Sequence, residues 1–304
     1  MLITAYCRPK EFKHLIDDAL GFASNLYLFL DNSSGKESTE TQRDIYECGE
    51  IAKMVAEEYP NVFVSRTSKN LGCYKAVTCA LDWFFQHEDA GLILEDDLVV
   101  GSEIGSLAEN LLSIQRNNFR IGSISFYRNY MYDLQVETKG KFVLSPFFSS
   151  WGWATWSDRW RLFRHNLLET HWTLRYMKYI NKGGLDGLRN WADVERRLSR
   201  NDLDSWAYRW MITHWLEEMD SLIVPYNLVE NIGFNQRATH TKSGKSNVIA
   251  TMRQINPTNL PVVKIHPRTK MEILRAVYGV NQISTLARKF TRKLIKSLYV
   301  NHDR

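Results

Sequence analysis

The sequence contains little cysteine, no long apolar run and no large excess of charge of one sign. Its four cysteines, Cys7, Cys48, Cys73 and Cys79, have neither the paired spacing of a zinc site nor the density of a disulfide scaffold, so we expect reduced thiols. No apolar run approaches the roughly 18 residues of a membrane-spanning helix. The opening segment also lacks the basic and apolar regions of a signal peptide. These absences predict an intracellular, cytoplasmic protein.

The net charge is only +5 over 304 residues. The basic residues form neither an aromatic-interleaved strand nor a recognised nucleic-acid-binding module, so we expect no nucleic acid as a partner. With 44% hydrophobic and 24% charged residues and no internal repeat, the composition is typical of a globular protein with one or two domains.

Short apolar segments alternate with longer helical patterns in the first part of the chain. The segments that we expect to be strands are Leu2 to Tyr6, Leu26 to Leu30, Val62 to Ser65, Gly91 to Leu94 and Ile121 to Phe126. The clearest helical patterns are Glu11 to Phe22, Glu40 to Glu58, Tyr74 to His87 and Glu103 to Gln115. This alternation predicts right-handed βαβ units, and therefore an α/β fold with a mainly parallel, doubly wound sheet flanked by helices.

Three consecutive carboxylates follow the fourth expected strand. Glu95, Asp96 and Asp97 end the apolar run Leu92 to Leu94, and clustered negative charge at a buried strand end is costly unless a cation compensates it. Oxygen ligands favour Mg²⁺ or Mn²⁺, which usually serve substrate phosphates through one or two carboxylates. The triplet therefore suggests a metal-bound nucleoside diphosphate at the carboxyl edge of the sheet. A solvated acidic turn is the alternative.

Polar residues also follow the first three expected strands. Arg8 comes after the first strand and can bind phosphate, or it is an ordinary surface arginine. Asp31 ends the second and suits a base or ribose, or a turn or helix cap. Asn70 and Gly72 follow the third, where a glycine lets the backbone approach a ligand closely.

The second half of the chain is rich in tryptophan, with nine of the ten from Trp151 onward. Large rings fill cores efficiently, and they also suit the apolar faces of sugars. Both roles stay open for Trp151, Trp153 and Trp206. Asp204 precedes an aromatic helical pattern, either as its N-cap or as a general base in an aromatic cleft. His240 lies in a polar loop, where it contacts phosphate or metal or has a structural role.

Several of these motifs occur together in a known enzyme family. They are Ala5-Tyr6-Cys7-Arg8, Leu94-Glu95-Asp96-Asp97-Leu98, Ile124-Ser125-Phe126, Trp151-Gly152-Trp153, Asp204-Ser205-Trp206 and the loop from Asn231 to Thr241. In this order they resemble the GT-A glycosyltransferases, which use nucleotide sugars. The closer likeness is to the inverting N-acetylglucosaminyltransferase I family and to bacterial hemolytic-protein-like glycosyltransferases. The resemblance covers most of residues 1–245.

The resemblance implies a role for each matching residue. Arg8 would meet the diphosphate and Asp31 the nucleoside. Glu95 would contact the donor sugar, Asp96 the ribose, and Asp97 the metal, Mn²⁺ or Mg²⁺. Asp204 would be the catalytic base, although Ser205 stands where the family has a second acid.

The resemblance also implies the reaction. A hexosyl or N-acetylhexosaminyl group would move with inversion from a nucleoside-diphosphate sugar, UDP-sugar favoured, to a hydroxyl of a glycan or lipid-linked acceptor in polysaccharide biosynthesis. The rival readings are a nucleotidyltransferase, although residues 5–20 contain no Gly-rich basic loop, and a non-catalytic glycan-binding domain.

We accordingly expect three regions: residues 1–140 as the nucleotide-sugar-binding half, 141–265 as the acceptor-side catalytic half, and 266–304 as a helical segment. In that last segment an apolar row at helical spacing lies opposite a basic row. The apolar row is Leu286, Phe290, Leu294 and Leu298, and the basic row is Arg288, Lys289, Arg292, Lys293 and Lys296. Such a basic amphipathic helix can lie on an anionic membrane, or it packs on the catalytic domain.

Overall fold

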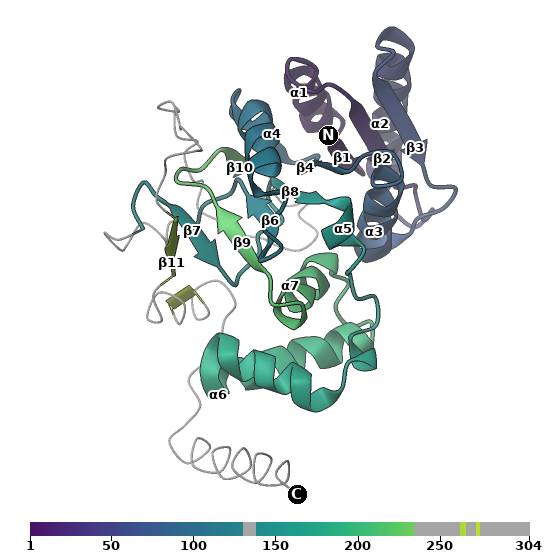
Figure 1. The fold of residues 1–304 in the computed structure, drawn as a ribbon. Coiled ribbons are helices and arrows are strands. Elements are labelled where there is room, and N and C mark those ends of the chain that lie inside the picture. Colours follow the sequence, from purple (N-terminus) through teal and green to yellow (C-terminus); the bar gives the residue numbers. More distant parts are fainter. Residues whose placement is uncertain (130–137, 234–261, 266–271, 274–304) are drawn as a thin grey trace, which may run out of the picture. The chain divides into compact units, whose positions relative to one another are not determined.

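The apolar segments that the sequence marks as strands join one mixed sheet (Figure 1). The computed structural model describes residues 1–129, 138–233, 262–265 and 272–273. Within these residues the sheet has nine strands in the order β11-β7-β9-β6-β8-β4-β1-β2-β3. The strands are β1 (Leu2–Ala5), β2 (Leu26–Leu30), β3 (Val62–Arg66), β4 (Ala90–Glu95), β6 (Ile121–Ser125), β7 (Phe142–Ser145), β8 (Trp153–Trp156), β9 (Asp220–Ile223) and β11 (Val262–Lys264).

The sheet is mainly parallel, as the sequence predicts. Strand β1 pairs in parallel with both β2 and β4, and β2 pairs in parallel with β3. The connecting helices are α1 (Pro9–Leu20), α2 (Thr39–Glu58), α3 (Gly72–Phe84) and α4 (Ile104–Gln115). The α/β fold class is confirmed, and each of the nine strands and helices predicted in this part forms close to its expected bounds.

Alternate residues of the strands face two different layers. Ile3, Leu28 and Leu94 belong to a buried apolar core that also contains Phe12 of α1 and Leu107 of α4. On the opposite face, α3 covers the sheet. There Tyr27 packs edge-on against Phe84, with ring centroids 5.1 Å apart, and Phe29 packs against Trp83. Both faces are therefore covered, which explains why the strands are continuous apolar runs.

Strand β8 is the main departure from the expected pattern. No strand is expected over this tryptophan-rich segment, but it lies antiparallel between β4 and β6. Ile93 pairs with Trp153 in this register, so the beginning of β8 lies beside the end of β4. The segment before β8 consequently meets the sheet at the edge where the acidic triplet lies.

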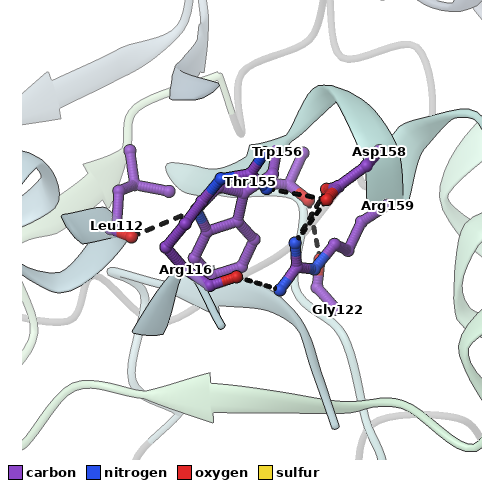
Figure 2. A network of polar contacts seen from close by, with 7 residues as sticks. All are labelled: Leu112, Arg116, Gly122, Thr155, Trp156, Asp158 and Arg159. Carbon is purple, nitrogen blue, oxygen red and sulfur yellow. Dashed lines mark hydrogen bonds and ion pairs between the residues drawn. The ribbon is translucent and has the colours of Figure 1, made fainter. Parts of the chain in front are cut away.

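A polar network fixes β8 and the short helix α5 (Ser157–Trp160) to the C-terminal end of α4 (Figure 2). The indole N–H of Trp156 donates to the carbonyl oxygen of Leu112 at 3.1 Å. The buried guanidinium of Arg159 donates to the carbonyl oxygen of Arg116 at 2.6 Å and pairs with Asp158 at 2.8 Å. These hydrogen bonds and the ion pair help to fix the position of β8.

A small antiparallel ribbon and one further helix complete the surroundings of the sheet. The ribbon consists of β5 (Leu98–Val100) and β10 (Val229–Asn231). The helix is α7 (Trp206–Leu216), which packs against α3. Strand β5 follows the acidic triplet directly, so the ribbon brings the end of β10 back to that triplet.

The described residues divide into two compact units. The first comprises Met1–Arg164 and Asp204–Lys264 and contains the sheet. The second includes His165–Leu203, with the 3-10 helix η2 (Leu167–Glu169) and α6 (Trp172–Ser199), which Gly184 interrupts. The functional boundaries at residues 140 and 265 stay predictions.

The second unit is held by a buried ion pair. Arg175 Nε lies 2.9 Å from Glu195 Oε2, and the hydroxyl of Tyr179 donates to the same oxygen at 2.6 Å. A cavity of about 990 Å³ lies beside this pair and is lined by residues of α6 together with Leu168 and Arg200. None of the residues predicted to form the functional site lines this cavity.

Two predictions on the C-terminal part fall outside the described residues: His240 and the amphipathic helix over residues 286–298. In the described part of the chain, no helix combines the length and the apolar character needed to span a membrane.

Candidate functional site

The acidic triplet lies where the ends of β1 and β4 meet. The backbone N–H of Asp96 donates to the carbonyl oxygen of Thr4 at 3.0 Å, and the backbone N–H of Tyr6 donates to Asp96 Oδ2 at 2.9 Å. These bonds continue the parallel pairing of β1 with β4 beyond the last strand residues. The structure thus brings the Arg8 segment and the triplet together, as the strand order predicts.

The guanidinium of Arg8 lies between two of the carboxylates. Its Nη1 is 3.0 Å from Asp96 Oδ1, and its Nη2 is 3.5 Å from Asp97 Oδ2. The side chain of Arg8 is only 15% exposed. Arg8 is therefore not an ordinary surface arginine but the internal counter-ion of the triplet.

One guanidinium does not neutralise three carboxylates, and their pKa values show the imbalance. Burial, followed by the charges of Asp97 and Asp96, raises the pKa of Glu95 to about 8 against the opposing effect of Arg8. Burial raises the pKa of Asp96 to about 6, although Arg8 lowers it. Burial also raises the pKa of Asp97. Without a further cation, the triplet holds protons that ordinary carboxylates would lose.

Asp97 has the surroundings that a metal ligand requires. Among the described residues its Oδ1 is buried without a hydrogen-bond partner. Besides Arg8, the end of β10 contacts Asp97: the backbone N–H of Ile232 donates to the Asp97 carbonyl oxygen at 2.9 Å, and the Asn231 side chain hydrogen-bonds the carboxylate. A Cβ on Gly233 would lie 2.2 Å from Asp97 Oδ2, so only glycine fits there beside the carboxylate.

These oxygens fit a hard divalent ion such as Mg²⁺ or Mn²⁺. In the described part of the chain no group of three or more histidine, cysteine or acidic side chains converges to hold a metal. The arrangement therefore suits an ion that takes one or two protein carboxylates and obtains its other ligands from water and substrate phosphates.

Asp31 fixes the loop between β3 and α3. Its carboxylate accepts the hydroxyl of Thr67 at 2.9 Å, the backbone N–H of Leu71 at 3.0 Å and that of Gly72 at 3.2 Å. These bonds support the capping role that the sequence left open, here at the start of α3. The predicted contact of Asp31 with the nucleoside stays a prediction.

Asn70 belongs to a polar network that sequence reasoning missed. Its amide donates to the carbonyl oxygen of Asn32 at 2.8 Å and to the Tyr6 hydroxyl at 3.4 Å. The Tyr6 hydroxyl donates to Glu37 Oε1 at 2.7 Å. No spacing in the sequence links Glu37 to Tyr6, because the contact joins the segments after β1 and β2 only once the strands pair.

The carboxylate of Asp204 lies at the first turn of α3. Its Oδ1 accepts the backbone N–H of Tyr74 at 3.2 Å. The sequence suggested an N-cap of the following helix, but Ser205 caps α7 by accepting the backbone N–H of Tyr208. The local capping assignment is thus wrong by one residue, because a tertiary contact recruits Asp204 to another helix.

Cys73 relates Asp204 to the acidic triplet. Burial, followed by the charges of Glu95 and Asp204, raises the pKa of the Cys73 thiol to about 12. Both carboxylates are therefore close enough to act on the same thiol. Glu95 and Asp204 thus both lie within electrostatic range of the first turn of α3.

The three tryptophans proposed to bind sugar have different environments. Trp153 is fully buried and Trp206 nearly so, and their rings stack with centroids 5.4 Å apart. This placement favours the core role for both rings, which offer no open face. Trp151 is partly exposed and packs edge-on against Tyr127 with centroids 4.6 Å apart.

The fold is distantly similar to that of solved structures. No protein-family model matches the sequence, and no curated protein matches it. Among solved structures, the chain is similar to the mannosyltransferase PcManGT from Pyrobaculum calidifontis, determined in complex with GDP-Man and Mn²⁺. The match has 12% identity and a TM-score of 0.39, and it covers 71% of this chain and 68% of the other.

Proposed function

We propose that the protein is a metal-dependent inverting glycosyltransferase that moves a sugar from a nucleoside-diphosphate sugar to a hydroxyl of a glycan or lipid-linked acceptor. The observation that carries this proposal is the buried triplet Glu95-Asp96-Asp97 at the carboxyl end of β4, with Arg8 beside it and one Asp97 oxygen unpaired among the described residues. UDP-sugar is the favoured donor, following the motif resemblance. The ion is Mn²⁺ or Mg²⁺, held by Asp97.

Each residue in the proposal has a distinct task. Arg8 binds the diphosphate of the donor, and Asp96 binds its ribose. Glu95 contacts the donor sugar from its partly buried position at the end of β4. Asp31 positions the loop that carries Asn70 and Gly72, and we assign the nucleoside to this part of the site. A bound divalent ion supplies Lewis-acid stabilisation of the departing diphosphate.

Asp204 is the general base of the proposal. It takes the proton of the acceptor hydroxyl as the hydroxyl oxygen bonds to the anomeric carbon, while the bond from that carbon to the diphosphate breaks on the opposite face. The Oδ1 of Asp204 accepts the backbone N–H of Tyr74, which holds the carboxylate at the first turn of α3.

Calorimetric binding of UDP and GDP, with and without Mn²⁺, tests the proposal. We expect Mn²⁺-dependent binding of at least one nucleotide in the unmodified chain, and loss of most of that dependence in Asp97→Asn. The matched control is Asp17→Asn, which changes an exposed aspartate paired with Lys13 on α1. Equal Mn²⁺-dependent affinity in Asp97→Asn and the unmodified chain would refute the assignment of the metal to Asp97.

A further inference from the structure

Arg8 contacts the carboxylate that would hold the metal ion. Its Nη2 is 3.5 Å from Asp97 Oδ2, while its Nη1 is 3.0 Å from Asp96 Oδ1. The guanidinium is the only cation that the described residues place in an ion pair with either carboxylate. In this state, the chain itself supplies part of the positive charge that the triplet needs.

The two contacts of Arg8 differ in strength. Asp96 also accepts the backbone N–H of Tyr6 at 2.9 Å, and it makes the shorter contact with Arg8. The contact with Asp97 is longer, and the Nε of Arg8 is buried without a hydrogen-bond partner among the described residues. The guanidinium is therefore incompletely satisfied, and its contact with Asp97 is the easier one to give up.

We propose that Arg8 competes with the divalent ion for Asp97 until the diphosphate of the donor draws the guanidinium away. This inference rests on the proposed function. It adds that the affinity for the metal ion is low in the absence of a nucleoside diphosphate and high in its presence. Arg8 thereby acts as a positioning residue for the metal as well as a ligand for the diphosphate.

The physical basis is repulsion between two cations at one carboxylate. A divalent ion must approach an oxygen to about 2.0–2.2 Å to coordinate it, and a guanidinium in contact with the same carboxylate raises the free energy of that state. Diphosphate oxygens accept charge-assisted hydrogen bonds from arginine and also bind the metal. Since coupling is reciprocal, the metal must strengthen nucleotide binding by the same factor.

The test measures binding of Mn²⁺ alone at pH 8, from the electron paramagnetic resonance signal of free Mn²⁺. We expect Arg8→Gln to bind Mn²⁺ about tenfold more tightly than the unmodified chain. Arg8→Lys keeps the positive charge and should stay close to the unmodified chain. The matched control Arg43→Gln removes an exposed arginine of α2 and should change nothing.

The same variants are then measured with UDP and GDP. In the unmodified chain the nucleotide should increase the affinity for Mn²⁺. In Arg8→Gln, the ratio of the Mn²⁺ affinities with and without nucleotide should be about tenfold smaller. If Arg8→Gln binds Mn²⁺ alone no more tightly than the unmodified chain, or if Arg8→Lys gains as much as Arg8→Gln, the inference is wrong.

A measurement on the unmodified chain covers the case in which Arg8→Gln does not fold. The Nε–H signal of Arg8, assigned by its loss in Arg8→Lys, should stay in place with Mg²⁺ alone and move when UDP or GDP is added with Mg²⁺. An unchanged signal on formation of the ternary complex would overturn the inference. Failure of the proposed function has a different signature, because the unmodified chain would then bind neither nucleotide with metal.

Discussion

Asp204 hydrogen-bonds Tyr74 across 130 residues of sequence, through a backbone N–H···Oδ1 contact of 3.2 Å. The contact places a carboxylate at the positive end of α3, where helix dipoles favour negative charge. The charges of this carboxylate and of Glu95 both raise the pKa of the Cys73 thiol. One interaction thus joins the stability of a helix to the proposed chemistry, and suitable variants can separate the two.

The first prediction concerns Asp204→Asn. Asparagine keeps an oxygen that can accept the Tyr74 N–H and caps helices about as well as aspartate, so the free energy of unfolding should change little. It cannot take a proton from the acceptor, so turnover should fall by about 10²-fold or more. Urea unfolding and steady-state turnover are the measurements.

A cap variant outside the site provides the comparison for Asp204→Asn. Ser38→Ala removes the hydroxyl that accepts the Thr41 N–H at the start of α2, which should cost about 1 kcal/mol of stability and leave turnover intact. Near-normal turnover in Asp204→Asn would show that the carboxylate is only a cap.

The second prediction concerns Gly72→Ala. Gly72 has φ +75°, and a Cβ there would lie 3.0 Å from Asp204 Oδ2. Gly35 has nearly the same backbone angle, φ +77°, but a Cβ added there would have no atom within 4 Å. Both alanine variants should lose about 1 kcal/mol or more of unfolding free energy from backbone strain. Only Gly72→Ala should also reduce turnover, because it displaces the carboxylate of Asp204.

The third prediction is a loss of stability with rising pH in the metal-free protein. The folded chain holds protons on Glu95 and Asp96 more tightly than the unfolded chain, in which their pKa values are about 4. The contribution of these two groups to the free energy of unfolding is therefore highest below about pH 4. It falls as the pH rises and levels off above about pH 8. The slope approaches about 1.4 kcal/mol per pH unit for each full proton of difference.

Thermal unfolding in chelator between pH 5 and pH 8.5 measures this slope. Glu95→Gln should flatten the decline above pH 6, and Glu47→Gln, which changes an exposed glutamate of α2, should not. Saturating Mn²⁺ should also flatten the decline, since it stabilises the ionised carboxylates. A melting temperature that rises from pH 6 to pH 8 in the metal-free protein would contradict the raised pKa of Glu95.

The fourth prediction concerns the basic segment over residues 286–298, which lies outside the described residues. If it forms the expected amphipathic helix, the full chain should co-sediment with anionic vesicles at low salt and be released at high salt. Each basic side chain contributes on the order of 1 kcal/mol near such a surface. A chain ending near Ser284 should bind less, and uncharged vesicles should bind neither. Equal binding of both chains to anionic vesicles would exclude this role for the segment.

The sequence predicts the parts of this fold that depend on local pattern. Apolar runs such as Leu26 to Leu30 determine strands because both sheet faces are covered, and the triplet after Leu94 lies beside the Arg8 segment because parallel strands end at the same edge. The features that local sequence patterns do not predict are those that depend on tertiary contacts. Nothing local distinguishes Asp204 from Ser205 as the cap of α7, since both residue types cap helices.

The same limit applies to the tryptophans. An indole ring suits a core and a sugar equally well, and only the stacking of Trp153 on Trp206 shows that both rings are buried. The antiparallel direction of β8 was likewise hidden, because a four-residue strand carries no signal of its orientation.

The position of β8 also affects the order in which the sheet can be assembled. Strands β1, β2 and β3 are close in sequence and can pair early. In contrast, β8 must insert between β4 and β6, and β6 must pair with β9, where Ile124 lies opposite Leu222. Closing such long loops costs chain entropy before any contact is gained. The part of the sheet that contains β1, β2 and β3 can therefore form while the part that contains β6 and β9 is still open, and a newly made chain exposes the unpaired edge of β4 until residues beyond Trp153 have left the ribosome.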